Sequence, residues 1–388
     1  NTVVLTVTDL NSNSSSCTAL VTVLDTILPV ALCQNVSVYL DFSGNGVVNS
    51  SSIDNGSSDS CGIQSLVLSE SQFSCSEVGS NTVVLTVTDL NSNSSSCTAV
   101  VTVLDSISPV ALCQNATVHL DLNGNGVLGT NSVDNGSSDA CGIQSLVLSE
   151  TQFSCADVGS KTVVLTVTDF NSNSSSCTAV VSVLDTISPV ALCQNATVQL
   201  DFSGNGVLST SSVDNGSIDA CGIQSLALSE TQFSCTAVGS NTVVLTVADV
   251  NSNSSSCAAV VSVLDTISPV TLCQNATVHL DSSGNGVLST LLVNSGSADA
   301  CGIQSLELSE SQFSCADVGS NTVVLTVTDL NSNSSSCTAL VTVLDTISPV
   351  ALCQNVTVHL DLNGNVVINS STIDSGSTDA CGIQSLVL

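Results

Sequence analysis

Apolar and polar residues alternate in short runs along the whole chain. The clearest run is TVVLTVTD at 162–169, which places Val163, Leu165 and Val167 on one face of an extended strand. CTAVVSVLD at 177–185 follows after an Asn/Ser-rich turn, and further strand-forming stretches are separated by Gly, Asn and Asp. No window shows a helical period. This pattern predicts roughly seven short, mostly antiparallel strands per repeat, packed as a two-sheet sandwich around aliphatic residues and one phenylalanine.

The pattern repeats at a constant interval. NTVVLTVTDLNSNSSSCTA begins at residues 1, 81 and 321, and close variants begin at 161 and 241. This period of about 80 residues is too long for a solenoid unit and suits one small autonomous domain. We therefore predict modules at 26–105, 106–185, 186–265 and 266–345. Residues 1–25 and 346–388 are the C-terminal and N-terminal parts of two further modules, so we expect the sequence to be a section of a longer protein.

The predicted joint between modules is the recurring LDTISP. Proline fixes φ, removes a hydrogen-bond donor and biases the residue before it towards extended geometry. No flexible Gly/Ser tract separates the modules. We expect a short, semi-rigid joint and an array that behaves as a beaded rod.

The charge balance is extreme, with 32 acidic residues against one basic residue, Lys161, and a net charge of −31. Such a chain repels nucleic acid and anionic lipid, so we expect no nucleic-acid partner and no direct membrane insertion. Only 9% of residues are charged and 43% are hydrophobic, which indicates a folded protein and not an acidic disordered tail.

Nineteen cysteines, four in each full period, indicate the compartment. There are no paired Cys-x-x-Cys zinc knuckles, so the spacing is typical of disulfide-stapled, exported domains, and we expect an extracellular location at the cell surface. Four cysteines allow three connectivities. One alternative crosses the joint, as Cys177–Cys193, and would lock neighbouring modules together. We favour one long-range and one local pair per module, which leaves Cys17, Cys353 and Cys381 unpaired. The favoured pairs are Cys33–Cys97, Cys61–Cys75, Cys113–Cys177, Cys141–Cys155, Cys193–Cys257, Cys221–Cys235, Cys273–Cys337 and Cys301–Cys315.

Several motifs together resemble a known family. A proline-marked start followed by a cysteine, VGSxTVVLTVTDxNSNSSSC and a final VxVLD resemble the hyalin-repeat (HYR) type of immunoglobulin-like module. DACGIQSLxLSE and the motif at each joint, DTISPVALCQNATVHLDxxGNG, resemble repeat arrays of Bacteroidetes surface proteins. These include gliding-motility adhesins exported by the type IX secretion system. The resemblance covers the whole chain. It implies an all-β tandem array of immunoglobulin-like antiparallel β-sandwiches.

Calcium is the one cofactor that the sequence suggests, and no organic cofactor is expected. TDLNSNSSSC at 88–97 spaces oxygen-bearing side chains two residues apart behind a carboxylate, which suits a hard cation. DLNGNG at 121–126 and the acids Asp134 and Asp139 are weaker candidates of the same kind. The alternative is that these residues only form Asx-turns. The predicted ligands are the turn residues together with the acids at the joints: Asp89, Asn91, Asn93, Asp105, Asp169, Asn171, Asn173, Asp185, Asp249, Asn251, Asn253 and Asp265.

The joints also contain a short tripeptide, Asp-Thr/Ser-Ile, that resembles the O-glycosylation signal of Bacteroidetes. Sugars at these positions would stiffen each joint and shield it from proteases. The predicted acceptor hydroxyls are Thr26, Ser106, Thr186, Thr266 and Thr346.

Catalytic chemistry finds little support. His119, His279 and His359 occupy one repeat position where other copies have Tyr39 or Gln199, as expected of an exposed strand site. There is no arginine, phosphate-binding loop or nucleophile elbow, so we expect no enzyme.

The functional prediction is the structural shaft of an extracellular bacterial surface filament or adhesin, used in cell adhesion or gliding motility. Its expected partners are neighbouring modules of the same chain and, beyond them, other filament copies or surface glycans. One alternative is a passive stalk that displays a catalytic or carbohydrate-binding domain outside this segment. Another is that the modules themselves bind glycans through their Ser/Thr/Asn loops, against which the scarcity of aromatic residues counts.

Overall fold

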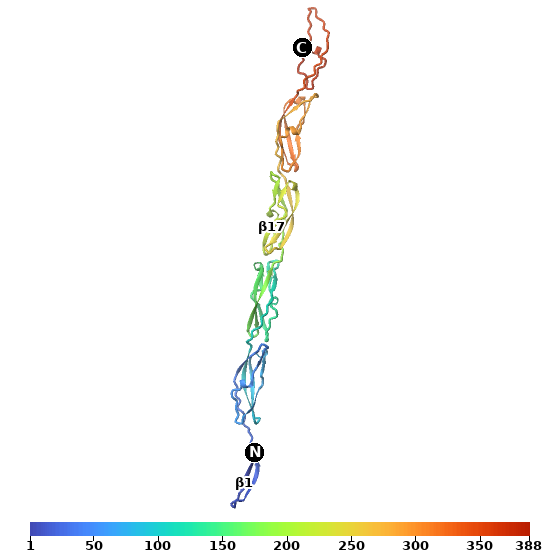
Figure 1. Ribbon diagram of the computed structural model, residues 1–388. Coiled ribbons are helices and arrows are strands. Elements are labelled where there is room, and N and C mark those ends of the chain that lie inside the picture. The colour runs from blue at the N-terminus through green and yellow to red at the C-terminus, as the bar shows by residue number, and fades with distance from the viewer. The chain divides into compact units, whose positions relative to one another are not determined.

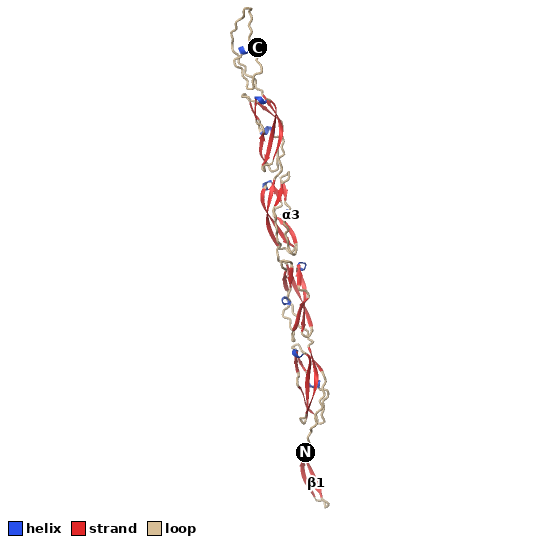
Figure 2. Cartoon of the chain, turned by 180° about the vertical axis from the view of Figure 1, so that it is seen from behind, coloured by secondary structure: helices blue, strands red, loops and turns tan.

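A computed structural model describes residues 1–388. The chain forms two compact units, Asn1–Ile187 and Ser188–Leu388. Both units are made of the same β-sandwich, repeated with the period seen in the sequence (Figure 1). Strands and loops account for nearly all of the chain, and the helices are single short turns (Figure 2). No helix is long and apolar enough to span a membrane.

Module 26–105 contains six strands in two sheets. The larger sheet has the strand order β3-β8-β7-β5, and the smaller sheet pairs β4 with β6. β3 runs parallel to β8, whereas all the other pairs are antiparallel. The elements are β3 (Val36–Tyr39), β4 (Asn45–Val47), α1 (Ser50–Ile53), β5 (Ile63–Leu68), β6 (Gln72–Ser74), η1 (Cys75–Glu77), β7 (Gly79–Asp89) and β8 (Ser94–Leu104).

The next three periods repeat this arrangement. Module 106–185 has β9 (Ala116–His119), β10 (Asn125–Val127), α2 (Thr130–Val133), β11 (Ile143–Leu148), β12 (Gln152–Ser154), η2 (Cys155–Asp157), β13 (Gly159–Asp169) and β14 (Ser174–Leu184). Module 186–265 has β15 (Ala196–Gln199), β16 (Asn205–Val207), α3 (Thr210–Val213), β17 (Ile223–Leu228), β18 (Gln232–Ser234), η3 (Cys235–Ala237), β19 (Gly239–Asp249) and β20 (Ser254–Leu264). Module 266–345 has β21 (Ala276–His279), β22 (Asn285–Val287), α4 (Thr290–Val293), β23 (Ile303–Leu308), β24 (Gln312–Ser314), η4 (Cys315–Asp317), β25 (Gly319–Asp329) and β26 (Ser334–Leu344).

The two ends of the chain hold partial copies of this arrangement. Residues 1–25 form the hairpin of β1 (Thr2–Thr8) and β2 (Ser14–Leu20), which corresponds to β7 and β8 of the full module. Residues 346–388 contain α5 (Ser370–Ile373) and otherwise only loops and isolated bridges. The all-β fold with repeated, disulfide-bonded modules is as predicted. The individual module boundaries remain a prediction.

The core follows the alternation that the sequence predicted. Val163, Leu165 and Val167 on β13 are fully buried, while the side chains between them are half-buried or exposed. Phe153, 3% exposed, completes the core from β12. Burial of the alternate aliphatic side chains supplies the main driving force for each sandwich, because one face of every long strand leaves water.

Gly126 illustrates how tightly the two sheets pack. A Cβ atom at this position of β10 would lie 2.4 Å from Cγ1 of Val118 on β9. No side chain fits there, because real Cβ contacts of this length do not occur. The GNG motif is therefore a turn followed by a close contact between two strands.

The structure differs from the predicted elements in two respects. The segment VALCQNATVHLD at 110–121, one of the predicted strand-forming stretches, forms two isolated bridges, at Val110 and Cys113, before the short strand β9. A single helical turn such as α2 also interrupts the predicted all-strand course. This turn is too short to produce a detectable period in the sequence, and it buries only Val133.

Candidate functional site at the module junctions

One disulfide in each module is as predicted. The bonds Cys33–Cys97, Cys113–Cys177, Cys193–Cys257 and Cys273–Cys337 each span 64 residues. In module 106–185, the bond joins the segment before β9 to the middle of β14. It therefore ties the early part of the module to its last strand.

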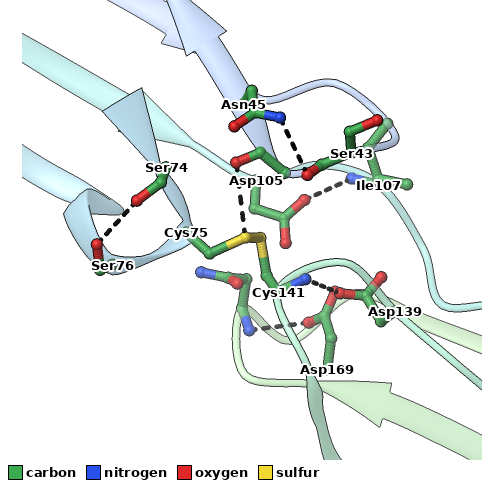
Figure 3. The surroundings of a disulfide bond; sticks show 12 residues. Ser43, Asn45, Ser74, Cys75, Ser76, Asp105, Ile107, Asp139, Cys141 and Asp169 are labelled. Atoms are coloured by element: carbon green, nitrogen blue, oxygen red, sulfur yellow. Dashed lines mark hydrogen bonds between the residues drawn. A yellow bond between two sulfur atoms is a disulfide. The ribbon is translucent and has the colours of Figure 1, made fainter. Parts of the chain in front are cut away.

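The second kind of disulfide joins one module to the next, and the predicted local pairs are wrong. The structure contains Cys75–Cys141 (Figure 3), Cys235–Cys301 and Cys315–Cys381, each spanning 66 residues. The incorrect predictions are Cys61–Cys75, Cys141–Cys155, Cys221–Cys235 and Cys301–Cys315. The alternative Cys177–Cys193 is also excluded, because both cysteines are bonded within their own modules.

Module 266–345 gives the physical reason for this error. Cys301 is bonded to the preceding module and Cys315 to the following one, although the two cysteines are close in sequence. Strand β23 lies between them and spans roughly 20 Å. A disulfide requires Cα atoms about 4.4–6.8 Å apart, and each of the two meets this requirement with a cysteine of another module, at 5.1 Å for Cys235–Cys301 and 5.0 Å for Cys315–Cys381.

Sixteen of the nineteen cysteines are disulfide-bonded, including Cys155 and Cys221. The unpaired ones are Cys17, Cys61 and Cys353. Cys381, predicted to be unpaired, instead bonds to Cys315, and Cys61 takes its place. A partner 64 residues before Cys17 or after Cys353, or 66 residues before Cys61, would lie outside residues 1–388.

The linker between modules is held by the hairpin of the module that follows. The Asn173 side-chain amide donates to the main-chain carbonyl of Asp105 at 3.3 Å, and the Ser175 hydroxyl donates to the carbonyl of Pro109. Asp105 Oδ1 in turn accepts from the amide of Ile107 at 3.0 Å. Equivalent contacts hold the linkers after Asp25 and Asp265. These hydrogen bonds give a physical basis for the short, semi-rigid joint that the sequence predicted.

The hairpin turn that begins at Asp169 is a closed hydrogen-bond network. Oδ1 of this fully buried carboxylate accepts from the amides of Asn171 and Asn173 at 2.8 Å, and Oδ2 accepts from the side chain of Asn173 at 2.8 Å. The same network surrounds Asp89. Burial alone would raise the pKa of Asp89, but the hydrogen bonds from Asn93 and Asn91 outweigh it and hold the pKa below its ordinary value. These residues therefore form the Asx-turn that was the alternative to calcium ligation.

The acid at the joint, Asp105, lies beside a different turn from the one predicted. Asp105 was predicted to join the Asp89 turn, but the two residues stand at opposite ends of β8, which is 11 residues long and spans roughly 36 Å. Asp105 lies instead beside the Asp169 turn of the following module (Figure 3). The predicted calcium set therefore mixed residues from two junctions.

A second acid, Asp139, completes the junction and was only a minor candidate in the sequence. Carboxylate oxygens of Asp105 and Asp139 lie within 4.8 Å of each other and of the Cys141 sulfur. Asp139 Oδ1 accepts from the amide of Cys141 at 2.8 Å (Figure 3). Asp105 Oδ2 is buried and has no hydrogen-bond partner. The linker acid could not be paired with Asp139 from the sequence, because the contact depends on how one module meets the next.

Glycine is required beside the junction disulfide. Gly44 has a φ of +75°, and a Cβ atom there would lie 2.6 Å from the sulfur of Cys75 and 3.4 Å from the Cβ of Ala140. The Cys75 sulfur also lies 3.8 Å from the Gly44 carbonyl oxygen. The GNG turn of one module thus makes room for the disulfide to the next.

Cys61 reports the electrostatics of this position, because it is unpaired. A hydrogen bond to Asp25, followed by the negative charges of Asp25, Asp59 and Asp89, raises the pKa of the Cys61 thiol. Three carboxylates therefore surround the cysteine at this junction. Such a field disfavours a thiolate, which is the form that attacks disulfides and ligates metals.

The remaining predicted site residues lie on the surface. The five residues predicted as O-glycosylation acceptors, at positions 26, 106, 186, 266 and 346, are all exposed. Modification of these hydroxyls stays a prediction. His119 and His279 are exposed on the short strands β9 and β21, and His359 is exposed in a loop.

Comparison with known proteins gives only distant structural similarity. No family model matches the chain, and no curated protein matches it. Among solved structures, the chain is similar to the protocadherin gamma B4 extracellular domain, at 14% identity and a TM-score of 0.29 over 91% of this chain and 72% of that one. It is also similar to the sidekick-1 immunoglobulin domains 1–5, at 10% identity and a TM-score of 0.28 over 82% and 80%. Drosophila N-cadherin EC1–4 follows at 9% identity and a TM-score of 0.26 over 80% and 99%. With TM-scores this low, the description of the chain as tandem immunoglobulin-like β-sandwiches stapled by disulfides, an extracellular type of fold, rests on its own strands and disulfides.

Proposed function

We propose that the chain is part of the structural shaft of an extracellular bacterial surface filament or adhesin that serves cell adhesion or gliding motility. The observation that carries this proposal is the disulfide between successive modules, as in Cys75–Cys141 and Cys235–Cys301. A covalent bond across the joint is useful where the joint bears load or faces proteases. The resemblance of the repeats to HYR-type modules of Bacteroidetes surface proteins supports the bacterial assignment.

The mechanism we propose is mechanical. Each module has its own core and an internal disulfide, so further modules can be added in series without any change in the fold of the others. The joints combine a proline, hydrogen bonds from the following hairpin and a disulfide. The length of the shaft would then follow the number of modules. The chain's partners would be neighbouring modules and, through surfaces outside the joints, other filament copies or surface glycans.

We propose no catalytic role for these modules. The three histidines occupy one repeat position and are exposed. A passive stalk that displays another domain would use the same cross-linked modules. The two functions differ in where the modules are found on the cell.

Electron microscopy of whole cells and of sheared surface material, labelled with an antibody to module 106–185, tests the proposal. Long filaments labelled along their length are expected of a shaft. Label confined to a thin layer at the envelope would contradict the filament and favour the display stalk. Preparations labelled in the presence of free module antigen provide the control for specificity.

A further inference from the structure

The junction between modules 186–265 and 266–345 contains a buried acid with an unused oxygen. Asp265 is the last residue of its module and is 9% exposed. Its Oδ1 accepts from the amide of Ile267 at 3.1 Å, whereas its Oδ2 is buried and has no hydrogen-bond partner. A carboxylate oxygen removed from water without a compensating contact is costly, so this atom requires a partner that the protein alone does not provide.

A second acid, from the next module, lies close to Asp265. A carboxylate oxygen of Asp299 lies within 4.8 Å of a carboxylate oxygen of Asp265. Asp299 uses Oδ1 to accept from the amide of Cys301 at 2.7 Å, which leaves Oδ2 for another partner. Two negative charges from two modules thus meet at one place. The chain's single basic residue, Lys161, is paired with Asp157 and does not neutralise them.

We propose that a divalent cation, calcium by the chemistry of its ligands, binds between Asp265 and Asp299 and joins the two modules there. Calcium takes oxygen ligands at about 2.3–2.6 Å, so two carboxylate oxygens that lie within 4.8 Å of each other can bind the same ion. The Cys301 sulfur belongs to the same group but is bonded to Cys235 and is not a thiolate. The donors are therefore hard oxygens, and water fills the remaining positions around the ion.

The neighbouring hairpin turn positions the site and is not itself a ligand in this proposal. Asp329 is fully buried, and its two oxygens accept from Asn331 and Asn333 at 2.8–2.9 Å. The side chain of Asn333 also donates to the Asp265 carbonyl at 3.2 Å. These bonds hold the main chain of Asp265, and with it the carboxylate, near Asp299 without an ion.

The same arrangement recurs in the other unit. Asp105 and Asp139 form the corresponding pair, and Asp105 Oδ2 is again buried without a hydrogen-bond partner (Figure 3). Asp25 and Asp59 form another pair, where the unpaired Cys61 also forms a hydrogen bond to Asp25. The near-identical copies thus place the same kind of acid pair at each of these joints. The inference goes beyond the proposed shaft and applies equally if the array is a display stalk.

Hydrogen–deuterium exchange of the full chain, followed by mass spectrometry, tests the site directly. Exchange is measured at pH 7.5 with calcium and with EDTA, in the wild type and in Asp299→Asn. The asparagine retains a side-chain oxygen to accept from the Cys301 amide, so the turn is preserved while the charge is lost. Residues 290–308 and 130–148 differ in sequence between the two junctions, so their peptides are distinguishable and the second junction is an internal control.

Calcium is expected to slow exchange at least threefold around residues 299–302 and 139–142 in the wild type. In Asp299→Asn, protection should disappear at 299–302 and remain at 139–142. Asp281→Asn, which removes an exposed turn acid of the same module, should retain protection at both places. Equal exchange with calcium and EDTA, or calcium protection that survives Asp299→Asn, would overturn the proposal. Protection produced by mild acid in place of calcium would do so too, since it would mean that the two acids share a proton.

Discussion

The overlapping disulfides predict a strict limit to how far the chain can be stretched. One covalent path between the termini follows residues 1–33, 97–113 and 177–193. It then follows 257 back to 235, then 301–315 and finally 381–388. Five disulfides connect these segments. The path crosses about 107 residues, so at roughly 3.3–3.6 Å per residue and 5–6 Å for each disulfide it extends to at most about 400 Å.

Reduction removes this limit. The complete backbone of 388 residues extends to about 1,300–1,400 Å once all disulfides are broken. Each module contributes to this difference in length, because its internal disulfide carries the force past the 64-residue segment that it closes. The difference depends only on which cysteines are bonded and not on the arrangement of the folded modules.

Single-molecule force spectroscopy with handles at the two termini measures both lengths. The oxidised chain should stop at about 400 Å, whereas the same chain in reductant should reach more than three times that length. Cys353→Ser, which removes an unpaired cysteine, should leave the oxidised limit unchanged. An oxidised chain that extends well beyond this limit would refute the connectivity from which the limit is calculated.

Three further predictions concern module 106–185. Lys161 is the chain's one basic residue and lies inside the loop closed by the internal disulfide. A lysine-specific protease acting on denatured, unreduced protein should therefore leave one covalent molecule that reduction separates into two, and separation without reductant would contradict the pairing. Phe153→Ala should destabilise the module by about 3–5 kcal/mol, whereas Phe170→Ala, at a site 65% exposed, should change it by less than about 0.5 kcal/mol. Native-state hydrogen exchange measures the stability of both variants. Equal destabilisation by the two substitutions would argue against a core position for Phe153. A hydrogen bond from Lys161, then others from Ser154, lower the pKa of Asp157 to about 2. The stability that this group contributes is present above its unfolded pKa near 4 and is lost as the pH falls through about 2. Lys161→Asn should raise the pKa of Asp157 in a carboxyl NMR titration. An unchanged midpoint would contradict the ion pair between Lys161 and Asp157.

Local order could be predicted from the sequence because it depends on neighbouring residues. The alternation in TVVLTVTD placed Val163, Leu165 and Val167 in the core, and the structure buries all three. The pair Cys113–Cys177 also followed from the sequence, because it connects an early and a late strand within one repeat. These features need only the period of the side chains and the length of the repeat.

The junction could not be predicted in the same way. The short segment between Cys301 and Cys315 suggested a local hairpin, but β23 pairs with β25, and β24 pairs with β22. The chain therefore crosses the module between the two cysteines. In a sequence whose copies are almost identical, Cys301 and Cys381 occupy the same repeat position, so the sequence does not show which of them bonds to Cys315. Only the fold shows which cysteines are bonded. The contact between Asp265 and Asp299 likewise depends on how one module meets the next.

Disulfide mapping by mass spectrometry of unreduced peptides tests most directly whether successive modules are covalently joined. The segments around Cys75, Cys141 and Cys155 differ in sequence, so each linked pair has its own mass. We predict a peptide that joins Cys75 to Cys141 and another that joins Cys235 to Cys301. Recovery of Cys141 linked to Cys155 in their place would mean that each module is closed on itself and that the junctions carry no covalent bond other than the backbone.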